Sequence, residues 1–217
     1  MQTPEDIFEK IDEAERLSAV DIIIPVAFEP FSFMIVQEIK KLRSNIERNR
    51  LYYSILNDER TIMLYEGVKA KTVKFANHNT QDDYWIETLG MAVALNDLGC
   101  DVCFLPEVGD NLKGTKRADA IIRFNNHWFI ADFKYFHSTN SNTLQVNLEE
   151  GFKQADTIVL KISNADAGTL KDSIDYLKRN GMKYGNIIVI NEYNKILELT
   201  AKQIKTERYK YLIKGFL

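Results

Sequence analysis

From residue 82 onward, hydrophobic and polar residues follow helix-like and strand-like periods in turn. Asp82 or Asp83 can cap a helix that runs to about Leu98, and Gly99 is placed to end it. Three strands, a helix, a strand, a helix and a strand are predicted to follow, at Asp101–Pro106, Ala118–Phe124, His127–Tyr135, Leu144–Ala155, Thr157–Ile162, Ala167–Arg179 and Asn186–Asn191. This order predicts an α/β (α+β) fold with a mixed β-sheet flanked by helices.

The first 80 residues have a less regular pattern. Apolar spacing predicts two helices and two short strands there, at 5–19, 33–56, Thr61–Tyr65 and Ala70–Phe75. The polar segment 76–81 lacks an apolar anchor and contains several turn-forming residues, so it predicts a domain boundary. We therefore expect an N-terminal helical and hairpin extension over 1–80 and a second domain over 81–217, with its core at 83–192.

Two acidic residues are predicted to face each other across a hairpin. Asn125-Asn126 suits a two-residue turn, and counting outward from it pairs Asp119 with Asp132. Their Cβ atoms would lie about 5 Å apart on otherwise apolar strands, which is costly unless a cation or a proton lies between the carboxylates. Lys134 is two residues beyond Asp132, so its side chain leaves the same face of the sheet.

This arrangement suits phosphate chemistry. A hard divalent cation prefers oxygen ligands, and a neighbouring ammonium can orient an attacking water or stabilise charge that develops on a phosphate. A plainer interpretation is also open: Asp119 would be a turn residue that enters the strand, and Asp132 with Lys134 would be a solvated surface pair. A shift of one residue in the hairpin register would also break the predicted pairing.

The preceding helix supplies a third carboxylate. Glu87 is the only charged residue between Asp83 and Asp97, and its neighbours at helical spacing are Met91, Ala94 and Leu98. A carboxylate on an apolar helix face is a candidate metal ligand, or a candidate residue for orienting the lysine, because carboxylates are rarely buried alone. The alternative is an exposed Glu in the first helical turn, where the helix dipole favours it.

These residues and their order resemble a known family. The segments that carry the likeness are Glu87, Gly99 with Asp101-Val102-Cys103-Phe104-Leu105-Pro106-Glu107, Lys116-Arg117-Ala118-Asp119-Ala120-Ile121-Ile122, Ala131-Asp132-Phe133-Lys134 and Gln154-Ala155-Asp156. They resemble the PD-(D/E)xK nuclease superfamily over about 83–162. The likeness is greatest to the C-terminal nuclease domains of contact-dependent growth inhibition toxins and to domains of some phage head-morphogenesis proteins.

The resemblance implies a restriction-endonuclease-like sheet and a set of roles. Glu87, Asp119 and Asp132 would hold Mg²⁺ or Mn²⁺, Lys134 would position the water, and Gln154 would line the site. Two positions depart from the family pattern: Ala118 stands where the family has Pro, and Asp132 stands where these toxins usually have Glu. The Asp side chain is one methylene shorter than that of Glu.

Basic residues occur in two further places. Lys113, Lys116 and Arg117 precede Asp119 in a predicted loop, where they are candidates for phosphate contact. The segment from Lys202 to Lys214, predicted as a helix, carries five positive residues, one negative residue and two tyrosines, Tyr209 and Tyr211. It can be interpreted as a segment that binds the nucleic-acid backbone, or as a solvated helix face whose tyrosines pack on the core.

Composition narrows the function classes. The chain has 28 Lys and Arg against 31 Asp and Glu, a net charge of −3, so coating of long stretches of phosphate backbone is not expected. Cys100 and Cys103 enter a predicted strand, which favours buried structural thiols over a redox or zinc motif. No apolar run is long enough for a membrane helix and no secretory signal is visible, so a cytoplasmic location is expected, or delivery within a larger exported chain.

The expected function is a metal-dependent endonuclease that hydrolyses phosphodiester bonds of tRNA or DNA, as a toxin effector or a protein of a phage or mobile element. In the toxin case, an immunity protein with acidic residues would cover the site. The alternative is a catalytically silent domain of the same fold that serves as a phage-structural or protein-interaction module.

Overall fold

The computed structural model describes residues 46, 48, 49, 53, 62–65, 73–75, 85–104, 118–124 and 127–217. The described residues fall into two compact units. Residues up to 85, 92–104, 119–124 and 127–129 belong to the first unit, and 86–91, 118 and 130–217 belong to the second. No helix of the described part is both long and apolar enough to span a bilayer.

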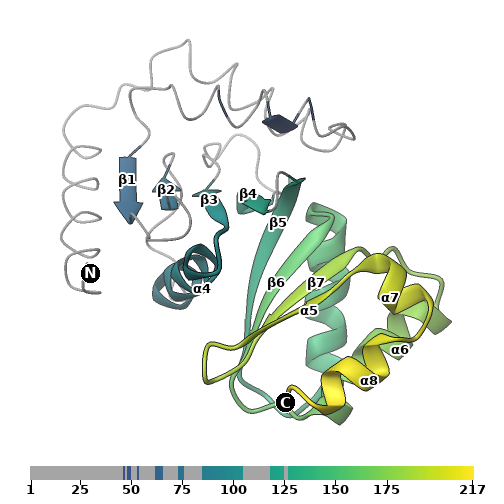
Figure 1. Ribbon diagram of the computed structural model, residues 1–217. Helices are drawn as coiled ribbons and strands as arrows, with labels where there is room; N and C mark the ends of the chain where they lie inside the picture. Colours follow the sequence, from purple (N-terminus) through teal and green to yellow (C-terminus); the bar gives the residue numbers. More distant parts are fainter. Residues whose placement is uncertain are drawn as a thin grey trace, which may run out of the picture. The chain divides into compact units, whose positions relative to one another are not determined.

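The first unit holds four short strands that follow one another in the sheet (Figure 1). These are β1 (Ile62–Tyr65), β2 (Val73–Phe75), β3 (Asp101–Phe104) and β4 (Ala120–Phe124). The β1–β2 and β3–β4 pairs are antiparallel, and the β2–β3 pair is parallel. The sheet of this unit is therefore mixed, as the sequence predicts.

Helix α4 (Trp85–Asp97) has residues 86–91 in the second unit and its remaining residues in the first. Gly99 follows it with φ of 100°, a left-handed conformation that glycine adopts at little cost. Its N–H donates to the carbonyl of Asn96 and the N–H of Cys100 donates to that of Leu95. The predicted helix end at Gly99 is confirmed.

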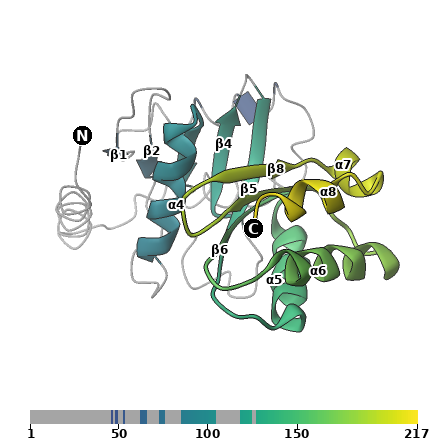
Figure 2. The same ribbon diagram turned by 60° about the horizontal axis from the view of Figure 1, so that its bottom comes forward.

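The second unit has strands β5 (His127–Phe136), β6 (Thr157–Ile162), β7 (Asn186–Ile190) and β8 (Ile196–Leu199), where β5 belongs to this unit from Ile130 onward. Strands β5, β6 and β7 are parallel, and β8 runs antiparallel to β7. Helices α5 (Ser141–Gln154) and α6 (Ala167–Arg179) follow β5 and β6, and α7 (Ala201–Lys205) and α8 (Tyr209–Lys214) follow β8 (Figures 1 and 2).

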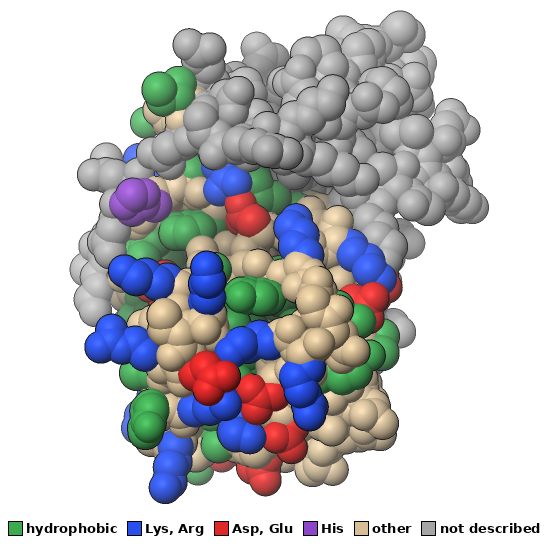
Figure 3. All heavy atoms as spheres, turned by 90° about the vertical axis from the view of Figure 1, so that its right-hand side faces the viewer, with side chains coloured by type: hydrophobic (Ala, Val, Ile, Leu, Met, Phe, Trp, Pro, Cys, Tyr) green, Lys and Arg blue, Asp and Glu red, His purple; other side chains and the backbone are tan. Residues whose placement is uncertain are grey.

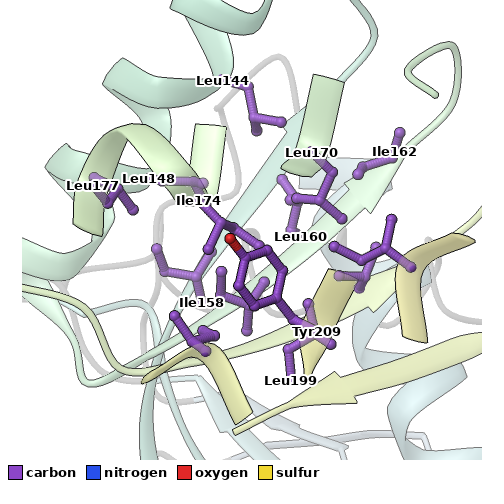
Figure 4. Packing of buried hydrophobic residues seen from close by; sticks show 14 of the residues in the cluster. Leu144, Leu148, Ile158, Leu160, Ile162, Leu170, Ile174, Leu177, Leu199 and Tyr209 are labelled. Carbon is purple, nitrogen blue, oxygen red and sulfur yellow. The ribbon is translucent and has the colours of Figure 1, made fainter. Parts of the chain in front are cut away.

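Helices α5, α6 and α8 pack on one face of this sheet and bury an apolar cluster with it (Figure 4). Apolar residues recur every three or four positions in α5 and α6, so each helix has one buried stripe. Each helix starts with a polar cap: Asn140 accepts the N–H of Asn142, and Asp166 accepts the N–H of Thr169. The strands contribute Phe136, Ile158, Leu160, Ile162, Ile187, Val189 and Leu199 to the cluster.

The predicted order of elements is confirmed from α4 to β7, and α6 and β6 have the predicted bounds. Strand β4 starts at Ala120, two residues later than predicted. Strand β8 was not predicted. It follows a turn in which Asn194 has φ of 55° and the Asn191 side chain accepts the N–H groups of Tyr193 and Lys195.

The single C-terminal helix predicted from Lys202 to Lys214 is wrong. The chain forms two short helices there, α7 and α8, and Glu207 between them has φ of 63°. The break is held by contacts with a distant element, because Glu207 accepts the ammonium groups of both Lys178 and Lys210. Such contacts between distant residues leave no mark on local periodicity.

Other predictions fall outside the described residues. The predicted helix 5–19 lies there entirely, and four residues of the predicted helix 33–56 are described and helical (Ile46, Arg48, Asn49 and Tyr53). The predicted boundary at 80–81 also lies there, so the division into 1–80 and 81–217 stays a prediction.

Candidate functional site

The site starts from a buried carboxylate on β5. Asp132 is 1% exposed, and its Oδ2 lies 2.7 Å from Nζ of Lys134, whose side chain is 24% exposed. The two side chains leave the same face of the strand, as predicted. The alternative in which Asp132 and Lys134 form a solvated surface pair is wrong for Asp132, because the Asp132 carboxylate is shielded from water.

The register of the sheet explains this burial. Asp132 is opposite Ile158 of β6, and Lys134 is opposite Leu160. Residues opposite each other in neighbouring parallel strands point to the same face, and Ile158 and Leu160 belong to the cluster that α5, α6 and α8 cover. The carboxylate therefore lies on the apolar, helix-covered face, where burying a charge costs several kcal/mol unless a partner compensates.

Helix α5 approaches this carboxylate very closely at Gly151. A Cβ atom at that position would lie 2.8 Å from Asp132 Oδ2 and 2.9 Å from Cδ1 of Ile158, so only glycine fits without displacement. Gln154, which the resemblance assigns to the site, is half-buried and lies three residues further along the same helix. Residues three apart on a helix are neighbours on its surface.

Glu87 combines both interpretations made from the sequence. It lies in the first turn of α4, where the helix dipole favours an acid, yet its Oε2 is buried and has no hydrogen-bond partner in the described part of the chain. The apolar face predicted for it is only partly buried: Met91 is 1% exposed, but Leu98 is 47% exposed. A buried carboxylate oxygen without a donor is costly and is a candidate ligand for a cation.

One further predicted site residue, Asp119, belongs to the other unit. Asp119 is half-buried just before β4 and belongs to the first unit, whereas Glu87, Asp132, Lys134 and Gln154 belong to the second. The predicted facing of Asp119 and Asp132 therefore stays a prediction.

A metal cage is not assembled in the part of the chain that the structure covers. Over those residues, no group of three or more His, Cys, Asp or Glu side chains converges as a metal site requires. The three-carboxylate set stays a prediction for this reason. The predicted phosphate-contacting residues Lys113, Lys116 and Arg117 lie outside the described residues.

The structure also contains a cluster of charged and polar side chains around Asp175 of α6, which the sequence did not predict. The Asp175 carboxylate accepts the hydroxyl of Tyr209 and lies 3.3 Å from Lys171 Nζ and 3.6 Å from Lys210 Nζ. Burial raises the pKa of Asp175, but the hydrogen bonds from Tyr209 and Lys171 and the nearby charges outweigh it and hold the pKa below its ordinary value. Burial, followed by the Asp175 carboxylate, raises the pKa of Tyr209.

Asp101 and the two cysteines of the chain have structural roles. Asp101 of β3 pairs with Arg123, which lies directly opposite on β4 and whose guanidinium stacks 5.5 Å from the Trp128 ring. Cys100 and Cys103 are buried and form no disulfide, which confirms the structural interpretation of that pair.

Comparisons with known proteins give one distant likeness. No protein-family model and no curated protein matches the chain. Among solved structures, a chain of a CdiA-CT/CdiI toxin and immunity complex from Burkholderia pseudomallei is similar at 22% identity and a TM-score of 0.42, over 56% of this chain and 88% of that chain. We draw no functional argument from a likeness of this size. The mixed sheet flanked by helices is established by the strands and helices of this chain alone.

Proposed function

We propose that this chain is a divalent-metal-dependent nuclease that hydrolyses phosphodiester bonds of nucleic acid. The observation that carries the proposal is the Asp132 carboxylate, buried on an apolar sheet face with the Lys134 ammonium 2.7 Å away. A fold gains no stability from burying an acid there that an apolar residue would not also give, so a chemical role accounts for it better.

The donor chemistry fits a hard cation. In this proposal Asp132 and Glu87 supply carboxylate oxygens, and Asp119 supplies a third. Support comes from the buried Oε2 of Glu87, which has no hydrogen-bond partner over the described residues. Bound Mg²⁺ or Mn²⁺ would polarise the phosphate and lower the pKa of a coordinated water.

The other residues would orient the reacting groups and exclude solvent from the Asp132 carboxylate. The Lys134 ammonium is partly exposed, so it can reach a water or the charge that develops on a phosphate oxygen. Gly151 keeps space for the Asp132 carboxylate and lets α5 seal it from solvent. Gln154 would line the site, and Lys113, Lys116 and Arg117 would contact substrate phosphates.

The test is cleavage of tRNA and plasmid DNA by the purified chain with Mg²⁺ or Mn²⁺, beside an EDTA control. Lys134→Met should abolish cleavage. Lys161→Met is the matched control, because Lys161 is opposite Tyr135 and therefore points to the other face of the same sheet. Cleavage that needs the metal and Lys134 but not Lys161 would support the proposal and name the substrate class.

The Asp119→Asn variant distinguishes a metal-ligand role of Asp119 from a structural role at the turn. It should remove cleavage without loss of stability, because one of two repelling carboxylates becomes neutral. A sharp drop in the melting temperature would instead assign Asp119 a structural role. Absence of both cleavage and calorimetric metal binding in the unmodified chain would favour the silent interaction module.

A toxin role with an immunity partner is part of the same proposal. Expression of the chain in a host cell should reduce growth, and Asp132→Asn should restore it. A partner protein with an acidic surface should then suppress both the toxicity and the cleavage in the test tube. Growth that is insensitive to the chain while cleavage persists would contradict the toxin role and leave the nuclease standing.

A further inference from the structure

The C-terminal helices present a group of cations that the fold does not use. Ile204 of α7 and Tyr209 and Ile213 of α8 are buried in the core. The opposite sides of these helices and the turn between them carry exposed residues, which we name the C-terminal basic face: Lys202, Lys205, Arg208, Tyr211 and Lys214. On the side of the molecule where α6, α7 and α8 lie, many Lys and Arg side chains reach the surface, with acidic and apolar side chains among them (Figure 3).

Charge pairing divides the lysines of this region into two sets. Lys178 and Lys210 lie 3.0 and 2.9 Å from the carboxylate of Glu207, the single acid from Ala201 to Leu217. The four cations of the C-terminal basic face have no ion-pair partner in the part of the chain that the structure describes. A local excess of positive charge therefore remains, in a chain whose net charge is −3.

The two tyrosines of α8 differ in the same way. Tyr209 is fully buried; its hydroxyl donates to Asp175, and the ammonium groups of Lys178 and Lys210 lie 5.7 and 6.0 Å from its ring centroid. Tyr211 is 85% exposed and lies three residues from both Arg208 and Lys214, so the cations flank its ring along the exposed side. The fold needs Tyr209 and leaves Tyr211 to solvent.

We propose that the C-terminal basic face binds a single strand of nucleic acid, with phosphates on the cations and a base stacked on Tyr211. Aromatic rings that alternate with cations are how proteins hold single strands without reading their sequence. A membrane surface fits less well, because Leu212 is the one other exposed large apolar residue on α7 and α8, at 37%. The inference shares the nucleic-acid partner of the proposed function but requires neither metal nor cleavage.

The experiment measures fluorescence anisotropy of labelled single-stranded RNA and DNA oligonucleotides with the full chain in EDTA, so that binding is separated from cleavage. Tyr211→Ala should weaken binding about fivefold or more. The double change Lys202→Gln with Lys205→Gln should lower the slope of log affinity against log salt by about 1.4, since each phosphate contact of a single strand contributes about 0.7.

Tyr193→Ala is the matched control. Tyr193 is 74% exposed in the β7–β8 turn but follows Glu192 rather than a cation, so its removal should leave affinity unchanged. Heparin supplies a polyanion without bases, and Tyr211→Ala should not weaken its binding. Unchanged melting temperatures confirm that the variants fold.

The inference would be overturned if Tyr211→Ala and the unmodified chain bound the oligonucleotides with equal affinity, or if Tyr193→Ala lost as much affinity as Tyr211→Ala. It would also be overturned if Tyr211→Ala weakened heparin binding as much as oligonucleotide binding. A chain that bound phosphatidylserine vesicles or an acidic protein but no single strand would contradict it as well. Failure here is separable from failure of the proposed nuclease: Lys134→Met in EDTA should still bind the strand, and cleavage without binding at this face would leave the nuclease standing.

Discussion

Two carboxylates of the second unit, Asp132 on β5 and Asp175 on α6, each pair with a lysine but lie in opposite settings. Asp175 is 21% exposed and joins α6 to α8 through the Tyr209 hydroxyl and the Lys210 ammonium, and it also pairs with Lys171 of its own helix. Asp132 is 1% exposed on an apolar sheet face, with Lys134 at 2.7 Å and a helix glycine against its oxygen.

The difference separates a structural acid, Asp175, from Asp132, the acid to which we assign a chemical role in the proposed function. Asp175 keeps contact with water and connects elements far apart in the sequence, so its charge costs little and it stabilises the packing of α8 on α6. The lysine beside Asp132 is Lys134, two positions away on the same strand. The burial of Asp132 is a cost that the fold does not require, and we interpret Asp132 as a functional position.

The largest effect is expected on the structural side. Tyr209→Ala removes a fully buried side chain from the apolar cluster and should lower the free energy of unfolding by about 3–5 kcal/mol. Tyr211→Ala, two residues away and 85% exposed, should change it by less than about 0.5 kcal/mol. Urea denaturation measures both. Similar losses in the two variants would mean that α8 is not anchored through Tyr209.

The next effect contrasts the two lysines. Lys134→Met leaves the Asp132 carboxylate buried without its ammonium and should cost about 3 kcal/mol in EDTA. Lys171→Met should cost far less stability, because the Lys171 side chain is 43% exposed and its ion pairs are screened by solvent. If the Lys134 ammonium occupies a position that a metal ion can take, Mn²⁺ should raise the melting temperature of Lys134→Met more than that of the unmodified chain. An equal shift in both would remove that argument.

The sequence predicted the second unit well wherever local patterns carry the information. The stripe of Leu170, Ile174 and Leu177 and the cap at Asp166 define α6, and an uninterrupted apolar run defines β6. The break between α7 and α8 was missed because Glu207 is held by Lys178, 29 residues away. The spacing of Asp132 and Lys134 predicted their shared face, but the closeness of Gly151 depends on how α5 docks, which no local pattern encodes.

A smaller effect follows from helix packing at Asp132. Gly151→Ala forces a Cβ to within 2.8 Å of Oδ2 and should cost about 1–3 kcal/mol, with weaker metal binding because the carboxylate is pushed aside. Gly90→Ala in α4 is the control, since nothing lies within 4 Å of its added Cβ and alanine should stabilise the helix by about 0.5–1 kcal/mol. Effects of the same sign at both positions would argue against close packing at Gly151.

The smallest effect is the pH dependence of the Asp175 cluster. The pKa of Asp175 in the folded chain lies below its ordinary value of 3.8, so its contribution to stability is present above that pH and is lost as the pH falls through the lower folded pKa. Tyr209→Phe removes one donor, should cost about 1 kcal/mol at neutral pH, and should make the acid loss shallower. Identical acid profiles for both chains, in melting experiments at descending pH, would show that the hydroxyl does not hold the carboxylate.

The most direct measurement is calorimetric titration of Mn²⁺ into the unmodified chain, Asp132→Asn and Asp175→Asn. If Asp132 is the functional acid and Asp175 the structural one, the unmodified chain and Asp175→Asn bind Mn²⁺ alike and Asp132→Asn does not bind it. Absence of binding in the unmodified chain, or equal binding in all three, would contradict the assignment of a metal-dependent site to Asp132.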